Sequence, residues 1–505
     1  MAVSDVVARH ARVLLCSVIA RLRRLGELNI MKNDRFKDYD SEVRQLVLSF
    51  ENAQRSGNTR YYDEEEMETI IDFYLDTADA AMLERSVRLG ERLFPTSSEM
   101  RLRRAHLLCV KERFDDALSL LTELHRLEPG NTDVCYALGA VYSALGKPEK
   151  SVHYYSIAAT DGYEPDTVYC NMADEYMAME RYDDAMLCAR RALKANNESN
   201  RALLLIGQVY YALGKHSQGS TFFSHYVKEH PYSSEGWYCL GASYFDAGLY
   251  EHAEEAYQYA IAIDDGFVDA YEQLAEVYGE LGQYDNAAHA LHNALQHSND
   301  KSYFNIKLGD LFRRQNNFVS AAVYYRTAIK SDPLDDDAWV ALATCYASMN
   351  DNDNACDVAE RALRKFPQSA HVMVSAAVIF GECNRHDEAR TLFEELISLY
   401  PEYLLAWVAY VDFLLSTEAY DDAIELISHG LTETDCAVVF HVRLAYCCYR
   451  TGRRNGLFDA VRACLHDCDD GAQQLLDYYP AFAADIDVMN IITSFENEKK
   501  QTNEK

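Results

Sequence analysis

The stretch of sequence that decides the fold is residues 234–267, which read SEGWYCLGASYFDAGLYEHAEEAYQYAIAIDDGF. In its first half, Trp237, Leu240 and Tyr244 are spaced three and four residues apart, so they share one face of a helix. Gly248 follows, where a glycine lets the chain leave the helix through a tight turn. Small and aromatic residues then resume the same helical spacing. The stretch therefore predicts two helices joined by a short turn.

This stretch is one unit of a repeat of 34 residues. Six of the nine prolines stand apart by multiples of 34, where the second helix of a unit must stop: Pro95, Pro129, Pro231, Pro333, Pro367 and Pro401. Units placed on this ruler begin at residue 64 and at every 34th residue up to residue 438, so twelve units fit without insertion or deletion. A period this regular is typical of a helical repeat array, in which each unit packs only on its neighbours.

Some positions of the repeat are restricted to small residues and one to an aromatic ring. The eighth position is small in successive units: Ala105, Gly139, Ala173, Gly207, Gly241, Ala275, Gly309, Ala343 and Ala377. The twentieth position is almost always alanine, glycine or serine. The eleventh position is aromatic: Tyr142, Tyr176, Tyr210, Tyr244, Tyr278, Phe312, Tyr346 and Phe380. A ring facing a small residue packs as a knob in a hole, which lets two helices cross closely. This position accounts for much of the excess of tyrosine, of which the chain has 36 against 3 tryptophans.

The composition excludes several kinds of function. The formal net charge is −32 and the sequence pI about 4.8, whereas nucleic-acid binding needs a basic stripe. The same charge disfavours anionic membrane surfaces and favours a basic or neutral partner, although it also serves simply to keep an elongated protein soluble. The 14 cysteines follow no framework spacing, so we interpret them as reduced core residues of a cytoplasmic protein.

The first thirty residues differ from the rest because they are basic. They hold five arginines against one aspartate and one glutamate. The apolar run at 13–20 is far shorter than the roughly 20 residues needed to span a bilayer. The segment therefore indicates either a basic amphipathic anchor or an upstream extension of a chain that starts at Met31, and the second interpretation is preferred.

The repeat resembles that of the tetratricopeptide-repeat family. The residues that carry the resemblance are Trp237, Leu240, Gly241, Tyr244, Ala253, Tyr257 and Ala260 in one unit, and Trp339, Leu342, Tyr346, Ala355, Ala362 and Pro367 in another. The chain is most similar to proteins of bacterial type that consist of these repeats alone. The resemblance implies an all-α fold, an α-α solenoid wound as a right-handed superhelix of about twelve 34-residue helix pairs with capping helices.

The expected domain organisation follows from the repeat frame. Residues 1–30 form the basic extension, and 31–63 an N-terminal capping helix region. The twelve repeats occupy 64–471, a C-terminal capping helix is expected over 472–495, and the tail 496–505 is expected to be disordered.

The resemblance also implies where a partner would bind. In this family the first helix of each repeat lines a concave groove that holds a peptide. The groove-facing positions here carry two kinds of side chain, aromatic ones (Tyr136, Tyr211, Tyr238, Phe245 and Tyr303) and acidic ones (Glu272, Glu276, Glu280 and Asp310). The family's lysine and asparagine clamp for a chaperone's C-terminal carboxylate is absent, since its positions hold residues such as Asp133 and Thr167.

The acidic residues include one stripe on a single helix face. Glu272, Glu276 and Glu280 are spaced four residues apart, and like charges at this spacing destabilise a helix by about 0.2–0.5 kcal/mol each. One interpretation is a docking site for a basic peptide. The other, which we prefer, is neutralisation by basic residues of the next repeat: Lys307, Arg313 and Arg314.

No enzyme or metal signature accompanies the repeats. The sequence contains no nucleophile elbow, no H-E-x-x-H and no dinucleotide fingerprint, and the last repeat groups Cys447, Cys448, Cys464, His466 and Cys468 without a C-x-x-C pair. We therefore expect no catalytic residues, no metal and no cofactor.

The predicted function is a non-catalytic, cytoplasmic scaffold that binds a protein or peptide in its groove, and the alternative is a membrane-associated assembly factor tethered by the basic N-terminal helix. The oligomeric state stays open.

The docking interpretation of the acidic stripe has a direct test. Replacing Glu272 and Glu276 by lysine reverses the charge on one helix face, so binding of a basic partner should weaken. Circular dichroism should show unchanged helicity in the same variant. Partner binding that survives the reversal would eliminate the stripe as a docking site.

Overall fold

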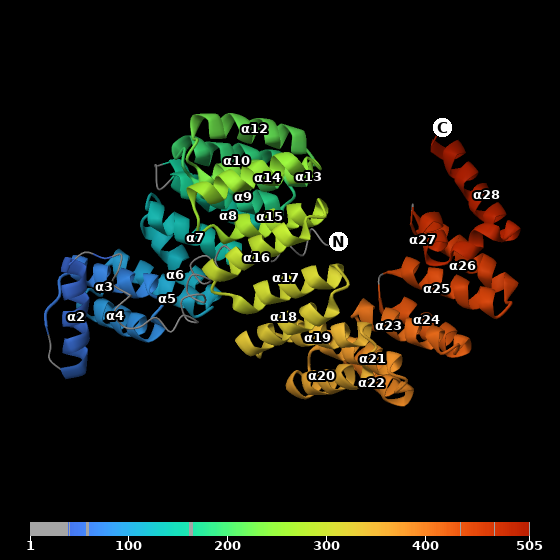
Figure 1. Cartoon of the computed structure of the whole chain (residues 1–505). Helices are drawn as coiled ribbons and strands as arrows, with labels where there is room; N and C mark the ends of the chain where they lie inside the picture. Colours follow the sequence, from blue (N-terminus) through green and yellow to red (C-terminus); the bar gives the residue numbers. More distant parts are fainter. Residues whose placement is uncertain are drawn as a thin grey trace. The chain divides into compact units, whose positions relative to one another are not determined.

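The structure, a computed structural model, describes residues 39, 41–56, 60–160, 165–434, 436–468 and 470–503 (Figure 1). Throughout these residues the regular structure is helical, with no strand. The all-α repeat fold predicted from the sequence is thus confirmed. The basic extension at 1–30 lies outside the described residues.

Twelve helix pairs follow the 34-residue frame. The first helices are α3 (Glu64–Asp76), α5 (Ser98–Val110), α7 (Thr132–Ala144), α9 (Pro165–Ala178), α11 (Asn200–Ala212), α13 (Ser234–Asp246), α15 (Val268–Glu280), α17 (Lys301–Arg314), α19 (Asp336–Ser348), α21 (Ala370–Glu382), α23 (Leu404–Ser416) and α25 (Ala437–Arg450). The second helices are α4 (Ala80–Leu93), α6 (Phe114–Leu127), α8 (Pro148–Thr160), α10 (Tyr182–Ala195), α12 (His216–Glu229), α14 (Tyr250–Ile263), α16 (Tyr284–His297), α18 (Phe318–Ser331), α20 (Asn352–Lys365), α22 (His386–Leu399), α24 (Tyr420–Glu433) and α26 (Arg454–Asp467). Every first helix begins within one residue of its frame position, and every second helix begins at the seventeenth position.

Additional helices cover the two ends of the array. α2 (Ser41–Ser56) packs Phe50 against α3, with its ring centroid 6.1 Å from that of Tyr74. At the other end, α27 (Gly471–Tyr478), a 3₁₀ turn and α28 (Ile486–Asn503) follow α26.

This C-terminal segment differs from the single capping helix expected over 472–495. Pro480 lacks a backbone N–H and starts the 3₁₀ turn, so the segment divides into two helices. The second one, α28, continues past residue 495 through most of the tail expected to be disordered, where neither proline nor glycine interrupts it.

The helices group into two compact units, Met1–Val277 and Tyr278–Lys505. In each unit the buried side chains come from consecutive helices. One core of the first unit runs from Tyr155 to Ala256, and one core of the second from Ala321 to Cys447. This arrangement is expected of a repeat array, whose core grows lengthwise.

Each turn inside a helix pair uses the same left-handed backbone conformation. The fifteenth residue of all twelve units, from Ala78 to Gly452, has a φ between 57° and 73°. Five of these residues are glycines, whereas others, such as Glu180, adopt the conformation despite a side chain. In that unit the next N–H, of Arg181, donates to the carbonyl of Tyr176 at 2.8 Å and so closes the helix end. The sequence signalled this turn only where glycine occupies it.

The two helices of a pair approach most closely at the eighth position. An added Cβ at Gly139 would lie 2.6 Å from the ring of Tyr155, and one at Gly241 would lie 2.8 Å from the ring of Tyr257. The ring that fills this hole therefore comes from the twenty-fourth position, which the sequence analysis did not single out. The eleventh-position ring lies instead beside the small twentieth position, as Tyr210 does beside Gly219.

The three tryptophans explain how a proline also orients the next repeat. The indole N–H of Trp237 donates to the carbonyl of Pro231 at 3.0 Å. The same bond joins Trp339 to Pro333 and Trp407 to Pro401. The proline that follows a second helix thus also anchors the first helix after it.

One carboxyl group lies buried in the core of the first unit. Glu175 of α9 is only 8% exposed. Burial raises the pKa of Glu175, and the hydroxyls of Ser143 and Ser151 oppose the rise. The charged form of this side chain therefore opposes folding.

Two glycines at the same frame position should respond oppositely to alanine. Gly139→Ala places a methyl group against the Tyr155 ring and should lower the free energy of unfolding by about 1–3 kcal/mol. At Gly207 the nearest ring atom, in Phe223, would be 3.7 Å away, so Gly207→Ala should keep or raise stability by up to about 1 kcal/mol through helix propensity. Urea unfolding of both variants measures the difference. Equal losses would show that the ring does not set the helix spacing.

The stability contributed by Glu175 should depend on pH. Because its pKa is raised in the folded state, ionisation above that pKa destabilises the protein, and the penalty is absent below the ordinary value of 4.5. Glu175→Gln should therefore stabilise the fold at pH 7, and the gain should shrink as the pH falls toward 4. Urea titrations of both proteins across this range provide the measurement, and a gain that does not vary with pH would contradict the assignment.

Candidate peptide-binding face

Successive first helices lie against one another within each unit. Close contacts join α9 to α11 and α11 to α13 in the first unit. In the second unit they join α19 to α21 and α21 to α23 (Figure 1). Successive second helices make no comparable contact within the described part of the chain. The first helices therefore form the inner side of each unit. We call the surface made by their solvent-facing side chains the first-helix face.

The aromatic residues predicted to bind a partner differ in accessibility. Tyr136 is half-buried, 5.6 Å from the ring of Tyr155, and its hydroxyl accepts a hydrogen bond from the Asn171 amide at 3.1 Å. Burial raises the pKa of Tyr238, whose ring lies 5.2 Å from that of Phe267. These rings pack mainly against their own unit.

The remaining predicted aromatics are Phe245, Tyr211 and Tyr303. Phe245 is half-buried, 5.5 Å from the ring of Tyr250. Tyr211 on α11 is 58% exposed, and Tyr303 on α17 also points a large part of its ring to solvent, beneath the Lys307 ammonium at 5.4 Å. Tyr211 is thus the most accessible aromatic of the predicted set.

The predicted acidic residues fall in different surroundings. Asp310 accepts a hydrogen bond from the Tyr325 hydroxyl at 2.8 Å and pairs with Arg313 of its own helix at 3.4 Å. Glu272, Glu276 and Glu280 all lie on α15; the first two are half-buried and belong to the first unit, whereas Glu280 is exposed and belongs to the second. Binding of a partner by this stripe stays a prediction.

Elsewhere, first helices exchange charges with their neighbours. Arg201 of α11 lies 2.5 Å from Asp174 of α9. Arg443 of α25 donates two hydrogen bonds, of 2.8 and 2.7 Å, to Asp412 of α23. At the N-terminal end, Arg103 bridges three carboxylates: Glu68, Asp72 and Glu99. Acidic groups on the first-helix face therefore often serve to hold neighbouring units together.

One stripe on α11 takes no part in these ion pairs. Leu204, Gln208 and Tyr211 share a helix face, and Leu204 is 40% exposed. The Gln208 side-chain amide, which is exposed, has no hydrogen-bond partner within the described ranges of the chain. Leu204 and Gln208 were not among the predicted site residues, although they occupy the fifth and ninth positions, which the family resemblance implies face the groove.

The described residues contain neither a candidate metal site nor a candidate membrane span. Nowhere in those ranges do three His, Cys, Asp or Glu side chains come close enough to hold a metal ion. In the last repeat, Cys464 is buried and donates to the carbonyl of Gly471 at 3.5 Å. None of the described helices has both the length and the apolar character needed to cross a bilayer.

Family models match much of the array. A model described as "Anaphase-promoting complex, cyclosome, subunit 3" matches residues 178–260. Models described as "Tetratricopeptide repeat" match residues 272–322, 306–370 and 384–435.

Known proteins share short parts of this sequence. "Tetratricopeptide repeat protein 8" of Caenorhabditis elegans is 23% identical over 37% of this chain and 38% of its own length. "Protein O-mannosyl-transferase TMTC1" of Homo sapiens is 23% identical over 40% of this chain and 22% of its length. "TPR repeat-containing protein" of Treponema pallidum is 23% identical over 35% and 20%. The chain thus spans less than two fifths of the length of these relatives, and the resemblance to repeat-only bacterial proteins stays a prediction.

Solved structures give a similar result. The APC/C hetero-tetramer Cut9–Hcn1 is 14% identical, covers 80% of this chain and 93% of its own, and has a TM-score of 0.33. The MamA protein is 24% identical, with coverage of 33% and 92% and a TM-score of 0.28. Residues 272–370 and 384–435 thus match models of the tetratricopeptide repeat, and the twelve helix pairs of 34 residues have the fold of such repeats, which is generally non-catalytic and typical of protein–protein interaction scaffolds.

Proposed function

We propose that this chain is a non-catalytic, cytoplasmic scaffold and that its first unit binds a partner peptide in extended form along α11. The observation that carries the proposal is the stripe of Leu204, Gln208 and Tyr211, in which two exposed apolar side chains flank an uncommitted amide. The partner is a protein segment rather than a small molecule, since the stripe is an open surface.

The apolar ends of the stripe supply affinity. Leu204 is 40% and Tyr211 58% exposed, so a partner that covers them removes apolar surface from water. Burial of such side chains contributes on the order of 1–2 kcal/mol each. Tyrosine adds a hydroxyl and a rigid ring, which favour it at the centre of interfaces.

The amide in the middle supplies direction. A glutamine side chain offers both a donor and an acceptor. The N–H and C=O of one peptide unit present the complementary pair when the peptide backbone is extended across the helix. Gln208 would therefore fix the register of a bound chain, while Leu204 and Tyr211 contact its side chains.

The neighbouring helices hold the stripe in place, and an ion pair lowers the negative charge beside it. α11 is in contact with both α9 and α13, so its position is set from two sides. The Arg201–Asp174 pair, 2.5 Å apart at the N-terminal end of α11, neutralises one acidic group of this face. A partner for this region consequently needs apolar side chains more than basic ones, whereas a basic partner remains the prediction for the α15 stripe.

The membrane-tethered alternative rests on residues 1–30, which lie outside the described residues. No observation on the described helices favours it.

Cross-linking and peptide selection together test the proposal. A photoreactive phenylalanine analogue at position 208 should cross-link to a protein in native extracts. The same analogue at position 232 should not, because Tyr232, although 86% exposed, lies in a turn outside the α11 stripe. Twelve-residue peptides selected from a display library on the intact chain should bind about tenfold more weakly to Tyr211→Ala and to Leu204→Ala.

Tyr232→Ala is the matched control, since it removes an even more exposed ring away from the stripe. It should leave peptide affinity unchanged. Selected peptides that bind all three alanine variants as tightly as the unsubstituted chain would place the interface elsewhere and refute the α11 site.

A further inference from the structure

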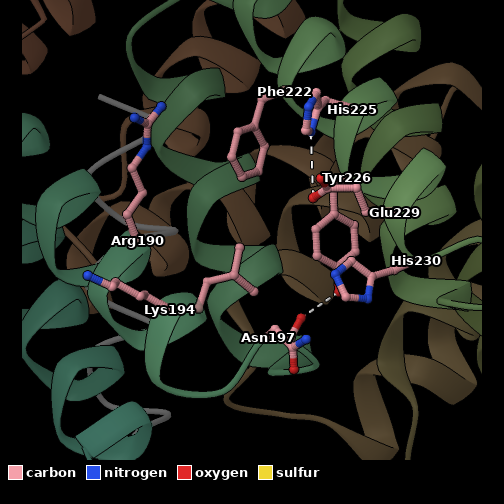
Figure 2. A pocket seen from close by; sticks show the side chains of 9 residues that line it. Arg190, Lys194, Asn197, Phe222, His225, Tyr226, Glu229 and His230 are labelled. Carbon is pink, nitrogen blue, oxygen red and sulfur yellow. Dashed lines mark hydrogen bonds and ion pairs between the residues drawn. The ribbon is translucent and has the colours of Figure 1, made fainter.

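A second candidate surface lies between consecutive second helices. A hollow of about 290 Å³ separates α10 from α12, with residues of both helices and of the turns after them in its walls (Figure 2). It exists because second helices stand apart on the outer side while the first helices are in contact. The hollow is therefore separate from the α11 stripe, and the inference does not rest on the proposed function.

The α10 wall is positively charged. Arg190 and Lys194 are exposed and one helical turn apart, and both line the hollow. Neither pairs with a carboxylate among the residues described; Arg190 donates to the Tyr210 hydroxyl at 2.9 Å, which fixes its direction. In a chain of net charge −32, two adjacent cations without an acidic partner are a local reversal of sign.

The α12 wall is aromatic and held in place by its own contacts. The Tyr226 hydroxyl donates to the carbonyl of Asn197 at 2.8 Å, and its ring stacks on that of His230 at 4.6 Å (Figure 2). Phe222 lies 5.6 Å from the Arg190 guanidinium. The acidic group of the hollow, Glu229, lies 3.7 Å from His225. A ligand would meet a preformed apolar surface beside two cations.

We infer that this hollow binds an acidic segment of a partner protein. An aspartate or glutamate carboxylate of that segment would lie between Arg190 and Lys194, where two charge-assisted hydrogen bonds are available. A neighbouring leucine or aromatic side chain would cover Phe222 and Tyr226. The volume of about 290 Å³ suits one or two side chains and lies at the lower limit for small-molecule pockets.

Charge complementarity favours an acidic peptide over nucleic acid. Binding of a nucleic-acid backbone needs a row of cations that contacts several phosphates, whereas the hollow offers two cations within a strongly acidic chain. The aromatic wall also favours a segment that carries an apolar side chain. Single-stranded nucleic acid, which stacks bases on aromatic rings, is the competing class that the experiment must separate.

The test uses the full chain and an array of twelve-residue peptides. Each peptide carries three or four Asp or Glu residues around one Leu, Phe or Tyr, and a second array replaces the acids by Asn and Gln. Fluorescence anisotropy should detect binding of acidic members only, weakening as salt rises. Arg190→Gln with Lys194→Gln should reduce that affinity at least tenfold, and Lys194→Gln alone, whose side chain makes no hydrogen bond or ion pair with a described residue, should reduce it severalfold.

The control variant removes the same amount of charge, one cation from each of the two helices that form the walls. Arg191 and Lys228 are exposed but do not line the hollow, so Arg191→Gln with Lys228→Gln should change affinity less than twofold. Tyr211→Ala should leave acidic-peptide binding intact, which separates this site from the α11 stripe.

Three results would overturn the inference: an equal loss in both double variants, no acidic peptide that binds more weakly to the Arg190/Lys194 variant, or a single-stranded oligonucleotide that outcompetes every peptide.

Discussion

The close approach of two helices at the eighth position of the repeat is the constraint on which the rest of the structure depends. In the tightest pairs a glycine there receives an aromatic ring from the second helix, as Gly139 receives Tyr155 and Gly241 receives Tyr257. The crossing fixes the shape of a single unit, and the left-handed fifteenth residue gives every unit the same turn. Because the units are alike, each presents the same surface to the next, and the array extends by repetition.

Stacking then decides which side chains remain available to a partner. Contact between successive first helices places carboxylates beside the arginines of the next unit, as Asp174 lies beside Arg201 and Asp412 beside Arg443. Much of the acidity of the first-helix face is therefore neutralised within the chain. The net charge of −32 is consequently a poor guide to the local character of this face, and α11 presents apolar and amide groups instead.

The period of 34 was enough to predict the start of every first helix to within one residue, because the positions of prolines and small residues reflect steric limits that act within a unit. The exposure of the residues predicted to face the groove could not be predicted the same way. Tyr238 and Leu204 both occupy a fifth position, yet Tyr238 is half-buried against Phe267 whereas Leu204 faces solvent. The difference depends on the last position of the unit, which the repeat pattern does not specify: Phe267 packs on Tyr238, whereas Ser233 holds that position in the unit of Leu204. The partner of the eighth-position glycine was missed for a related reason, because the twenty-fourth position tolerates leucine and alanine in other units, including Leu121.

The same geometry that gathers the first helices keeps the second helices apart, so the outer side of each unit offers spaces whose chemistry varies from repeat to repeat. The two cations of α10 recur in α18, where Arg326 and Lys330 hold the same frame positions. The facing helix there, α20, brings Val358 and Ala362 to the positions that Phe222 and Tyr226 occupy in α12. A pair of cations on a second helix is therefore not unique to α10. The space between α10 and α12 differs because its cations lie beside a fixed aromatic wall. A repeat protein can in this way keep one scaffold geometry throughout and still assign different recognition chemistry to its two sides.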